Sequence, residues 1–414
     1  MGGHEPLLSE AFCSRSRREW ANLLSLSISW LKINTNQDFT YGTGVTGSVR
    51  LRDACAYYLN KHFVGLDKQP TLQVKPDHII MGTGLISILP VIARIVCNPR
   101  VGILIAAPYY SGFDSNFKFS GACPIPVKVP YDKIGTADEV EYLETAMAPG
   151  INAVVLCNPH NPLGRAYQKK AIEAYCRFAE KHNLHLICDE IYAQSVFGED
   201  AQQFTSVLSL DLVDLEVNPA RVHVLYSMSK DFSASGFRIG LCVSRDNPSI
   251  IQSMAAQATF MRVSSPADIL WSALLLSDQE NRAPEDFKNI TEYLRDNKCI
   301  LKSAYDEVIE SLQHLGIHYI EASAGLFMMV DFRPIIEDKT GKVGPIVGFD
   351  DKTPMSDRER LLNLYLQEKY KVCLSPGLPY HMQECGWFRL VFSIRDKVRQ
   401  EGLKRLSNAL KPLL

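Results

Sequence analysis

A lysine, two serines and an arginine lie close together just after an apolar run. The run, residues 222–226, predicts a buried strand, and Lys230 follows it with Ser227 and Ser229 beside it and Arg238 eight residues later. In α/β folds, sites lie beyond the carboxyl ends of such strands. An amine can form an imine with an aldehyde, and two hydroxyls and a guanidinium suit a phosphate, so the group predicts a site for pyridoxal phosphate. The alternative is a surface lysine beside an ion-pairing arginine.

Strand-like and helical patterns alternate through the first two-thirds of the chain. The candidate strands are continuous apolar runs at 101–106, 153–157, 184–188, 222–226 and 239–243. Helical spacing falls between them, for example at 51–59 and 85–97. Because the strands are continuously apolar, the pattern predicts an α/β fold whose mostly parallel sheet is covered by helices on both faces.

The pattern changes after about residue 280. A long charged helix at 284–315 precedes a strand at 326–332, a polar loop at 337–354, a further helix and a strand at 387–393. This order predicts a smaller α+β domain. The predicted domains are therefore an N-terminal segment (1–46) belonging to the small domain and to dimer contacts, a large domain (47–280) and a small domain (281–414).

Composition indicates an ordinary globular enzyme. Of the 414 residues, 46% are hydrophobic and 22% charged, and the net charge of −2 argues against a nucleic-acid or anionic-membrane surface as a partner. No apolar run approaches the ~18 residues that span a bilayer, and the N-terminus lacks the features of a signal peptide. The eleven cysteines show no C-x-x-C spacing, which predicts reduced thiols in the cytoplasm and no metal site. Several lie in apolar stretches, namely Cys55, Cys97, Cys157, Cys188 and Cys242.

Three further residues follow strands and suit an aromatic cofactor ring. Asp189 ends the run 184–188, where a carboxylate could pair with a pyridine nitrogen; a helix N-cap is the alternative. Tyr192 and Asn161 could donate to the phenolic oxygen of the cofactor. For Tyr192 the alternative is simple packing, and for Asn161 it is a structural turn, since it lies in the stiff Asn-Pro loop 158–164.

Four other residues suit the cofactor phosphate, the pyridine ring and the substrate carboxylate. Thr83 and Gly84 precede a predicted helix, whose first amides can bind a phosphate, although many helices begin after glycines. Tyr110 could stack on the pyridine ring or belong to the core. Arg389, in the apolar run 387–392, needs an anion partner, which is either a substrate carboxylate or a structural salt bridge.

The stretch 42–47 has the spacing G-x-G-x-x-G of dinucleotide-binding folds. Such a site requires a buried strand immediately before it, but residues 32–38 are too polar for one. We therefore reject an oxidoreductase of this type.

The chain resembles the fold-type-I pyridoxal-phosphate enzymes of aminotransferase class I and II, and among them the 1-aminocyclopropane-1-carboxylate (ACC) synthase-like branch. The matching stretches are 109–114, 158–164, 188–192, 227–240, 324–327, 375–377 and 386–389. The resemblance implies an aspartate aminotransferase-like fold and a homodimer in which Tyr41 reaches the neighbour's cofactor phosphate. It implies Lys230 as the imine lysine, Asp189 at the pyridine nitrogen and Tyr110 on the ring. Asn161 and Tyr192 would contact the phenolic oxygen, Thr83, Gly84, Ser227 and Arg238 the phosphate, and Arg389 the substrate carboxylate.

The chain also departs from this family. The family usually has an arm before a Gly-x-Ala-Glu-Asn motif, and we expect residues 2–8 to be the counterpart of this motif, without that arm before them. Glu5 would keep the family's glutamate, whereas Pro6 replaces the asparagine. Ser235 replaces a proline of the plant relatives, and residues 264–267 differ from the usual Thr-Gln run. These differences affect the edge of the predicted site, where Glu5 and Tyr41 would meet the substrate.

The resemblance implies an α-amino-acid substrate, bound as an external aldimine, whose α-proton Lys230 removes to leave a carbanion. Loss of a group from the β- or γ-carbon then gives elimination, ring closure on S-adenosylmethionine or C–S lysis of a cysteine conjugate. Cleavage of this kind is the favoured interpretation. Reprotonation at the cofactor gives transamination, the alternative. A non-catalytic binding protein is a third hypothesis, against which the complete set of cofactor residues argues.

Overall fold

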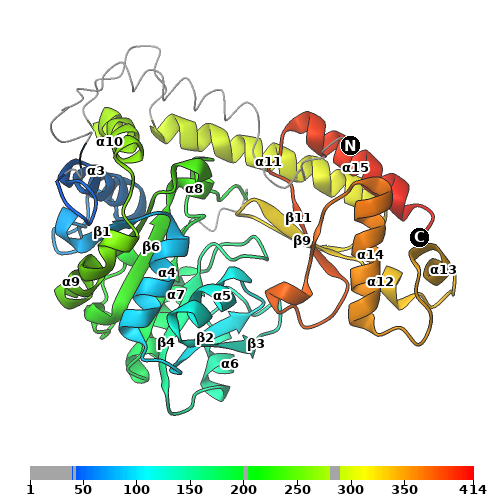
Figure 1. The fold of residues 1–414 in the computed structure, drawn as a ribbon, viewed down its shortest axis with the longest axis horizontal. Coiled ribbons are helices and arrows are strands. Elements are labelled where there is room, and N and C mark those ends of the chain that lie inside the picture. Colours follow the sequence, from blue (N-terminus) through cyan, green and yellow to red (C-terminus); the bar gives the residue numbers. More distant parts are fainter. Residues whose placement is uncertain (1–39, 41–42, 199–203, 280–289) are drawn as a thin grey trace.

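The computed structural model describes residue 40 and residues 43–198, 204–279 and 290–414. Its large domain contains a seven-stranded sheet (Figure 1). In spatial order the strands are β1 (Ile79–Gly82), β7 (Gly240–Val243), β6 (Val222–Ser227), β5 (His185–Asp189), β4 (Ile151–Cys157), β2 (Gly102–Ala107) and β3 (Cys123–Lys128). Only β7 runs antiparallel to its neighbours. The prediction of a mostly parallel sheet is confirmed.

Helices cover both faces of this sheet because the side chains of its strands alternate between two buried clusters. In β4, Val154 and Leu156 belong to one cluster, and Ala153, Val155 and Cys157 belong to the other. The first face is covered by α3 (Val49–Leu59), α6 (Glu139–Thr145), α7 (Lys169–Lys181) and α10 (Ser265–Gln279). The second is covered by α4 (Leu85–Val96), α5 (Gly112–Ser120) and α9 (Pro248–Gln257).

All five predicted strands of the large domain are present, as β2, β4, β5, β6 and β7. Strands β1 and β3 were not predicted. Strand β3 contains Pro124 and Pro126 and is mostly unburied. It lies at the edge of the sheet, where proline costs no ladder hydrogen bond, so its sequence lacks the apolar signal of an inner strand.

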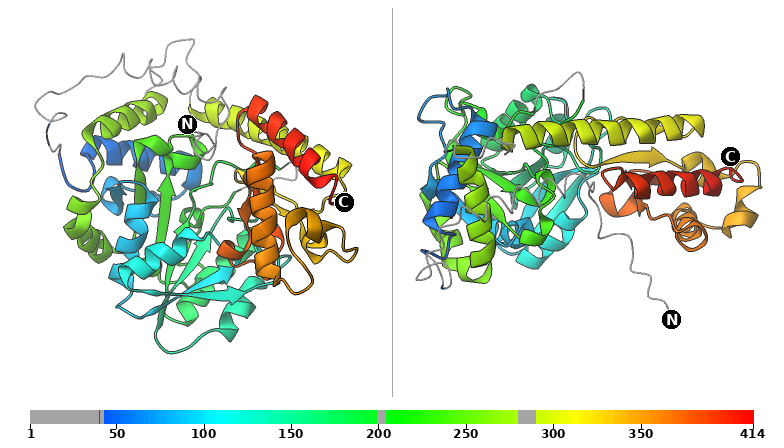
Figure 2. Two further views of the ribbon diagram at one scale, coloured as in Figure 1. Left: turned by 45° about the vertical axis from the view of Figure 1, so that its right-hand side comes forward. Right: turned by 90° about the horizontal axis from the view of Figure 1, so that it is seen from above.

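The small domain packs helices on a four-stranded antiparallel sheet. The strand order is β10 (Ser375–Pro376), β11 (Trp387–Val391), β9 (Phe327–Asp331) and β8 (Tyr319–Ile320). Its helices are α11 (Ile290–His314), α12 (Arg333–Glu337), α13 (Val343–Val347), α14 (Met355–Tyr370) and α15 (Asp396–Leu410). Figures 1 and 2 show α11 running from the large domain into the small one. Accordingly, its first turns are buried in the large-domain core and its later turns in the small-domain core.

The prediction of a loop over 337–354 was wrong in part, because α13 lies within it. Asp338 Oδ2 accepts a hydrogen bond from the Gly344 amide at 2.7 Å, and the helix buries Val343 and Val347 against the small-domain core. A single helical turn held by one carboxylate leaves too short a pattern to recognise in the sequence.

Short helical turns connect the longer elements. They are the π-turn Asn60–Val64, the one-turn helix α8 (Met228–Asp231) and the 3₁₀ turns Pro76–His78, Val207–Ser209, Pro219–Arg221, Ser235–Phe237, Ala258–Phe260 and Leu378–Tyr380. The five cysteines predicted in apolar stretches are buried, and the ten cysteines in the described ranges are all free. Within those ranges no helix has the length and apolar character required to cross a membrane.

Candidate active site

The predicted cofactor residues meet at one edge of the large sheet. Asp189 ends β5, where it lies opposite Cys157 of β4 and Leu225 of β6. Asn161 lies in the loop that follows β4, and Lys230 lies in α8, directly after β6. Because these strands are parallel, their carboxyl ends share this edge, which places a base, a carboxylate and an amide in one site.

Lys230 is half-buried and lines a cavity of about 590 Å³ together with Tyr192 and Arg389. No hydrogen bond or ion pair joins its amine to another residue of the described chain. Burial and the nearby Arg389 charge lower the pKa of Lys230, whereas Asp189 opposes the shift. A lysine with a lowered pKa and no partner is suited to form an imine and to accept a proton. The surface-lysine alternative does not match this environment.

Asp189 is 4% exposed, and burial raises its pKa to about 7, against the opposing effects of the Ile191 amide and Lys230. Its Oδ1 accepts a hydrogen bond from the Ile191 amide at 3.2 Å. The carboxylate therefore caps a turn and not a regular helix. A buried carboxylate whose charge is this costly is stabilised by a cationic partner, and the protonated nitrogen of a pyridine ring is one.

The residues predicted at the phosphate form a close-packed corner. Gly84 has φ +76°, and a Cβ atom there would lie 2.5 Å from Nη2 of Arg238. Arg238 donates from Nη2 to the Thr83 carbonyl at 3.3 Å and from Nη1 to the Ser235 carbonyl at 2.9 Å. Only glycine thus allows the guanidinium to lie against the start of α4, so the positive charge and the first helix amides face the same space.

The two serines beside Lys230 differ in their bonding. Ser227 Oγ donates to the Ile239 carbonyl at 2.7 Å and lies 2.8 Å from the Ser229 hydroxyl. Both serines are buried. Since the Ser227 proton is engaged by a backbone carbonyl, Ser227 stabilises the approach to β7, and Ser229 has the more available hydroxyl.

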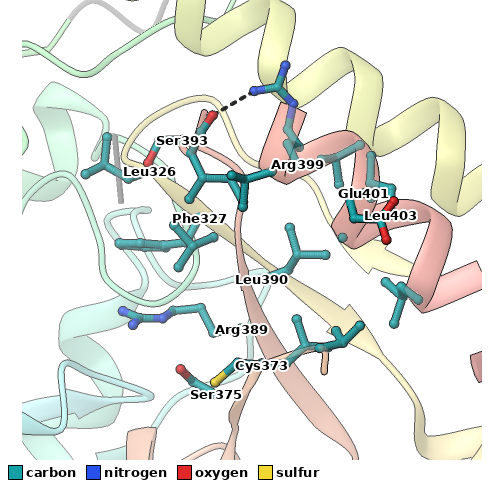
Figure 3. A pocket seen from close by; sticks show the side chains of 18 of the residues that line it. Leu326, Phe327, Cys373, Ser375, Arg389, Leu390, Ser393, Arg399, Glu401 and Leu403 are labelled. Atoms are coloured by element: carbon teal, nitrogen blue, oxygen red, sulfur yellow. Dashed lines mark hydrogen bonds between the residues drawn. The ribbon is translucent and has the colours of Figure 1, made fainter. Parts of the chain in front are cut away.

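Arg389 lies between two aromatic rings, with its guanidinium carbon 4.7 Å from the ring centres of both Phe327 and Tyr380. Nη1 donates to Asn161 Oδ1 at 3.1 Å, while the buried Nε has no partner. Among the residues that the structure describes, no carboxylate lies within ion-pair distance of this arginine. The structural salt-bridge alternative therefore lacks a partner, and the unused donors suit a carboxylate ligand. Figure 3 shows Arg389 and Phe327 in the wall of the cavity, near Ser375.

The two predicted tyrosines also line the region. Tyr192 is 5% exposed and meets Phe327 edge-on, with ring centres 5.4 Å apart; burial raises its pKa, so it remains a neutral donor. Tyr110 is 38% exposed and is therefore not a core aromatic. A Cβ atom at Gly112 would lie 2.4 Å from its ring, so the glycine permits this placement.

Glu5 and Tyr41, predicted at the substrate mouth, lie outside the described residues. The altered stretch 264–267 begins α10, and Ser265 Oγ donates to the Thr40 carbonyl at 3.0 Å. The stretch thus contacts the residue that precedes Tyr41.

Sequence reasoning did not identify Phe327 and Tyr380 as the supports of Arg389. Phe327 lies in the quoted stretch 324–327, but nothing in its spacing indicates a stacked arginine. Tyr380 follows the stretch 375–377 and meets Arg389 only through the fold.

Comparisons with known proteins agree with this geometry. Residues 20–406 match the family model "Aminotransferase class I and II". The chain is 32% identical over 384 residues to the probable aminotransferase tcpI of Claviceps purpurea, covering 91% of this chain and 82% of that protein. It is 29% identical over 382 residues to ACC synthase 6 of Arabidopsis thaliana, covering 90% and 70%. Its fold resembles that of N-succinyldiaminopimelate aminotransferase from Mycobacterium tuberculosis, with a TM-score of 0.73 and 20% identity, over 99% of this chain and 92% of the other.

Proposed function

Since the chain belongs to the class I and II aminotransferase family and is an enzyme that uses pyridoxal phosphate, we propose that it cleaves a bond at the β- or γ-carbon of an α-amino acid, including a C–S bond. In this proposal Lys230 binds the cofactor aldehyde and Asp189 pairs with the ring nitrogen. Asn161 and Tyr192 contact the phenolic oxygen, and Tyr110 the ring. The phosphate is held by Thr83, Gly84, Ser227, Ser229 and Arg238.

The bound cofactor supplies an electron sink for the electron pair that remains on the α-carbon once its proton has left. The Lys230 amine accepts that proton, a role favoured by its lowered pKa. Asp189 keeps the proton on the ring nitrogen, because its buried charge needs a cationic neighbour. Arg389 binds the substrate carboxylate through the donors that no described residue uses.

The observation that favours cleavage is the likeness to ACC synthases across most of the chain. Making a 1-amino-cyclopropane carboxylate from an open-chain amino acid requires a bond between the α- and γ-carbons and the departure of a group from the γ-carbon. An enzyme built on the same scaffold can lose a β- or γ-substituent after the same first proton transfer. The Phe327 ring, which lines the cavity beside Arg389, offers an apolar surface for such a substituent.

Transamination is the second candidate, because the fungal relatives at 30–32% identity are described as probable aminotransferases. It uses the same Lys230, Asp189 and Arg389. The two reactions differ in whether Lys230 delivers its proton to the cofactor or a leaving group departs first, so these residues alone do not discriminate between them.

The two candidates differ in turnover without a 2-oxo acid. With S-benzyl-L-cysteine and no acceptor, cleavage releases many thiols per subunit and the enzyme keeps its yellow colour. Transamination stops after one turnover per site and the colour fades. Free thiol, 2-oxo acid and the visible spectrum are followed together, with Lys230→Ala as the inactive control. Bleaching that only an added 2-oxo acid reverses, without thiol from this or other S-substituted cysteines or ring product from S-adenosylmethionine, would exclude cleavage.

We also propose a homodimer that works in the cytoplasm. Two large apolar side chains, Ile86 at 64% and Phe260 at 89% exposure, lie on elements that both contact β1, beside the phosphate corner. A partner that covered them would lie next to the site, where Tyr41 is proposed to act. The free cysteines of the described chain suit a reducing compartment.

A further inference from the structure

The two domains meet beside Arg389 through two pairs of residues. Tyr109 and Asp114 belong to the large domain, and Tyr380 and His381 to the turn that precedes β11 in the small domain. We refer to these four residues as the interdomain contact. None of them belongs to the set that was assigned to the cofactor or the substrate above.

Several interactions between the side chains of Tyr109, Asp114 and His381 form the interdomain contact. His381 Nε2 lies 2.7 Å from Asp114 Oδ2, and Tyr109 donates its hydroxyl proton to Asp114 Oδ1 at 2.8 Å. The rings of Tyr109 and His381 are stacked, with centres 4.4 Å apart. Tyr109 is buried, and burial and the bond to Asp114 raise the pKa of its hydroxyl, which keeps it a donor.

The contact reaches Arg389 through Tyr380. The Tyr109 amide donates to the Tyr380 carbonyl at 2.9 Å, and the Tyr380 ring lies on the Arg389 guanidinium at 4.7 Å. His381 ends the 3₁₀ turn Leu378–Tyr380 with φ +60°, a left-handed conformation that non-glycine residues adopt at a cost. The strained turn and the stacked ring therefore depend on the groups that hold His381.

We propose that Asp114 and His381 are positioning residues for the substrate carboxylate, because they hold Tyr380 against Arg389. This inference rests on the proposed role of Arg389. The side chains of the pair are 25% and 32% exposed, so their attraction contributes little to overall stability. Their effect is local: they set how the small domain presents the guanidinium to a ligand that is held by the large domain.

Two reagents separate carboxylate recognition from cofactor reactivity without knowledge of the substrate. Hydroxylamine and aminooxyacetate both form an oxime with the cofactor aldehyde, but only aminooxyacetate carries a carboxylate. Absorbance follows oxime formation on the holoenzyme. The rate with aminooxyacetate divided by the rate with hydroxylamine measures how well a carboxylate is recognised. We expect His381→Asn and Asp114→Ala to lower this ratio about five- to tenfold, less than the ~100-fold that a 1 Å misplacement of a reacting group can cause. The hydroxylamine rate itself should stay unchanged.

The variants are chosen to separate positioning from folding. Asparagine tolerates the left-handed turn at 381 but is too short to reach Asp114. The double variant should lower the ratio by less than the product of the two single effects, because both single variants break the same contact between Asp114 and His381. Gln383→Ala is the matched control, since Gln383 Nε2 also crosses between the domains, to the Val129 carbonyl at 2.7 Å, and within the described chain it has no hydrogen bond to Tyr380. It should leave the ratio unchanged.

A second readout follows the turn directly. Hydrogen exchange of the holoenzyme, measured by mass spectrometry, should become faster in peptides that cover residues 109–114 and 378–382 in His381→Asn but not in Gln383→Ala. If Arg389→Lys leaves the rate ratio unchanged, Arg389 is not the carboxylate site and the premise fails. If Arg389→Lys lowers the ratio but His381→Asn and Asp114→Ala do not, the positioning role is overturned while that of Arg389 stands.

Discussion

Asp231, the residue after Lys230, offers the sharpest test of how the site is held together. Its side chain is fully buried. Oδ1 accepts from the Ser195 hydroxyl at 2.6 Å, and Oδ2 accepts from the Gln194 amide and the Tyr226 hydroxyl, both at 3.0 Å. The carboxylate thus fastens α8 to the segment that follows Tyr192.

Removing this carboxylate leaves three buried donors without their acceptor. Each unpaired donor costs roughly 1–3 kcal/mol. Tyr226 keeps its contact with Tyr58, so two donors are left without a partner. We therefore expect Asp231→Ala to lower the free energy of unfolding by about 4 kcal/mol. Unfolding entropy is about 2.1 cal/mol/K per residue, or about 0.9 kcal/mol/K for 414 residues. The expected fall in melting temperature is therefore about 4–5 °C.

Asp231→Asn should be milder and should change the pH dependence. Its amide can donate to Ser195 Oγ while its oxygen accepts the other two donors. Burial raises the pKa of Asp231 to about 7 from 3.8, against hydrogen bonds that lower it. Because the folded-state pKa is the higher one, the protonated group stabilises the fold at low pH, and this contribution is lost as the pH rises through about 7. Between about pH 4 and pH 7 the wild type should therefore lose up to ~1.4 kcal/mol per pH unit relative to the neutral asparagine variant, and above about pH 7 the loss should level off.

Thermal melts of the cofactor-free protein, followed by circular dichroism at about pH 6 and about pH 8.5, test both effects. Asp214→Asn, at an exposed position, serves as the control and should melt like the wild type at both pH values. The reasoning is refuted if Asp231→Ala melts within about 1 °C of the wild type. It is equally refuted if the difference between wild type and Asp231→Asn is the same at both pH values.

Three further predictions concern the cofactor and the assembly. Gly84→Ala should weaken cofactor binding about tenfold or more, because its Cβ atom would meet the Arg238 guanidinium. Gly236→Ala should not weaken binding, because its Cβ atom would have no other atom within 4 Å. Titration of the cofactor-free protein with the cofactor measures both affinities. Borohydride should fix the cofactor to Lys230, and mass spectrometry should find no fixed cofactor in Lys230→Ala; a label on another lysine contradicts the assignment. Light scattering should show a dimer, and Phe260→Asp should shift it toward monomer; an active monomeric wild type would exclude the proposed dimer.

The meeting of the proposed cofactor residues at one sheet edge could be predicted from the sequence because its signals are local. Asp189, Asn161 and Lys230 each follow an apolar run within a few residues, and parallel strands bring such positions to one edge. The inner strands were found for the same reason, since burial on both faces leaves a continuous apolar pattern. Strand β3 escaped because edge strands lack that pattern.

The supports of the site could not be predicted because they join distant segments. Asn161 and Arg389 are 228 residues apart, and Ser195 and Asp231 are 36 apart. No periodicity relates such residues, and a buried aspartate or a stacked tyrosine looks in sequence like any other. Helix α13 was missed for a related reason, because a carboxylate at Asp338 and not a long pattern holds its single turn.

The proposed site is divided between two domains, and this division would let closely similar residues serve different reactions. The groups proposed to hold the cofactor all come from the large domain, where they are fixed by one sheet edge and by buried carboxylates such as Asp189 and Asp231. Arg389 comes from the small domain, where its guanidinium donates to Asn161 of the large domain and the interdomain contact joins its neighbour Tyr380 to Tyr109. On the proposed function, changes in the small domain would alter which substrate side chain is held, and which bond at its β- or γ-carbon is exposed, while Lys230 and Asp189 stay at the same edge of the large sheet. Substrate choice is accordingly expected to vary with the few residues that connect the domains more than with the cofactor residues themselves.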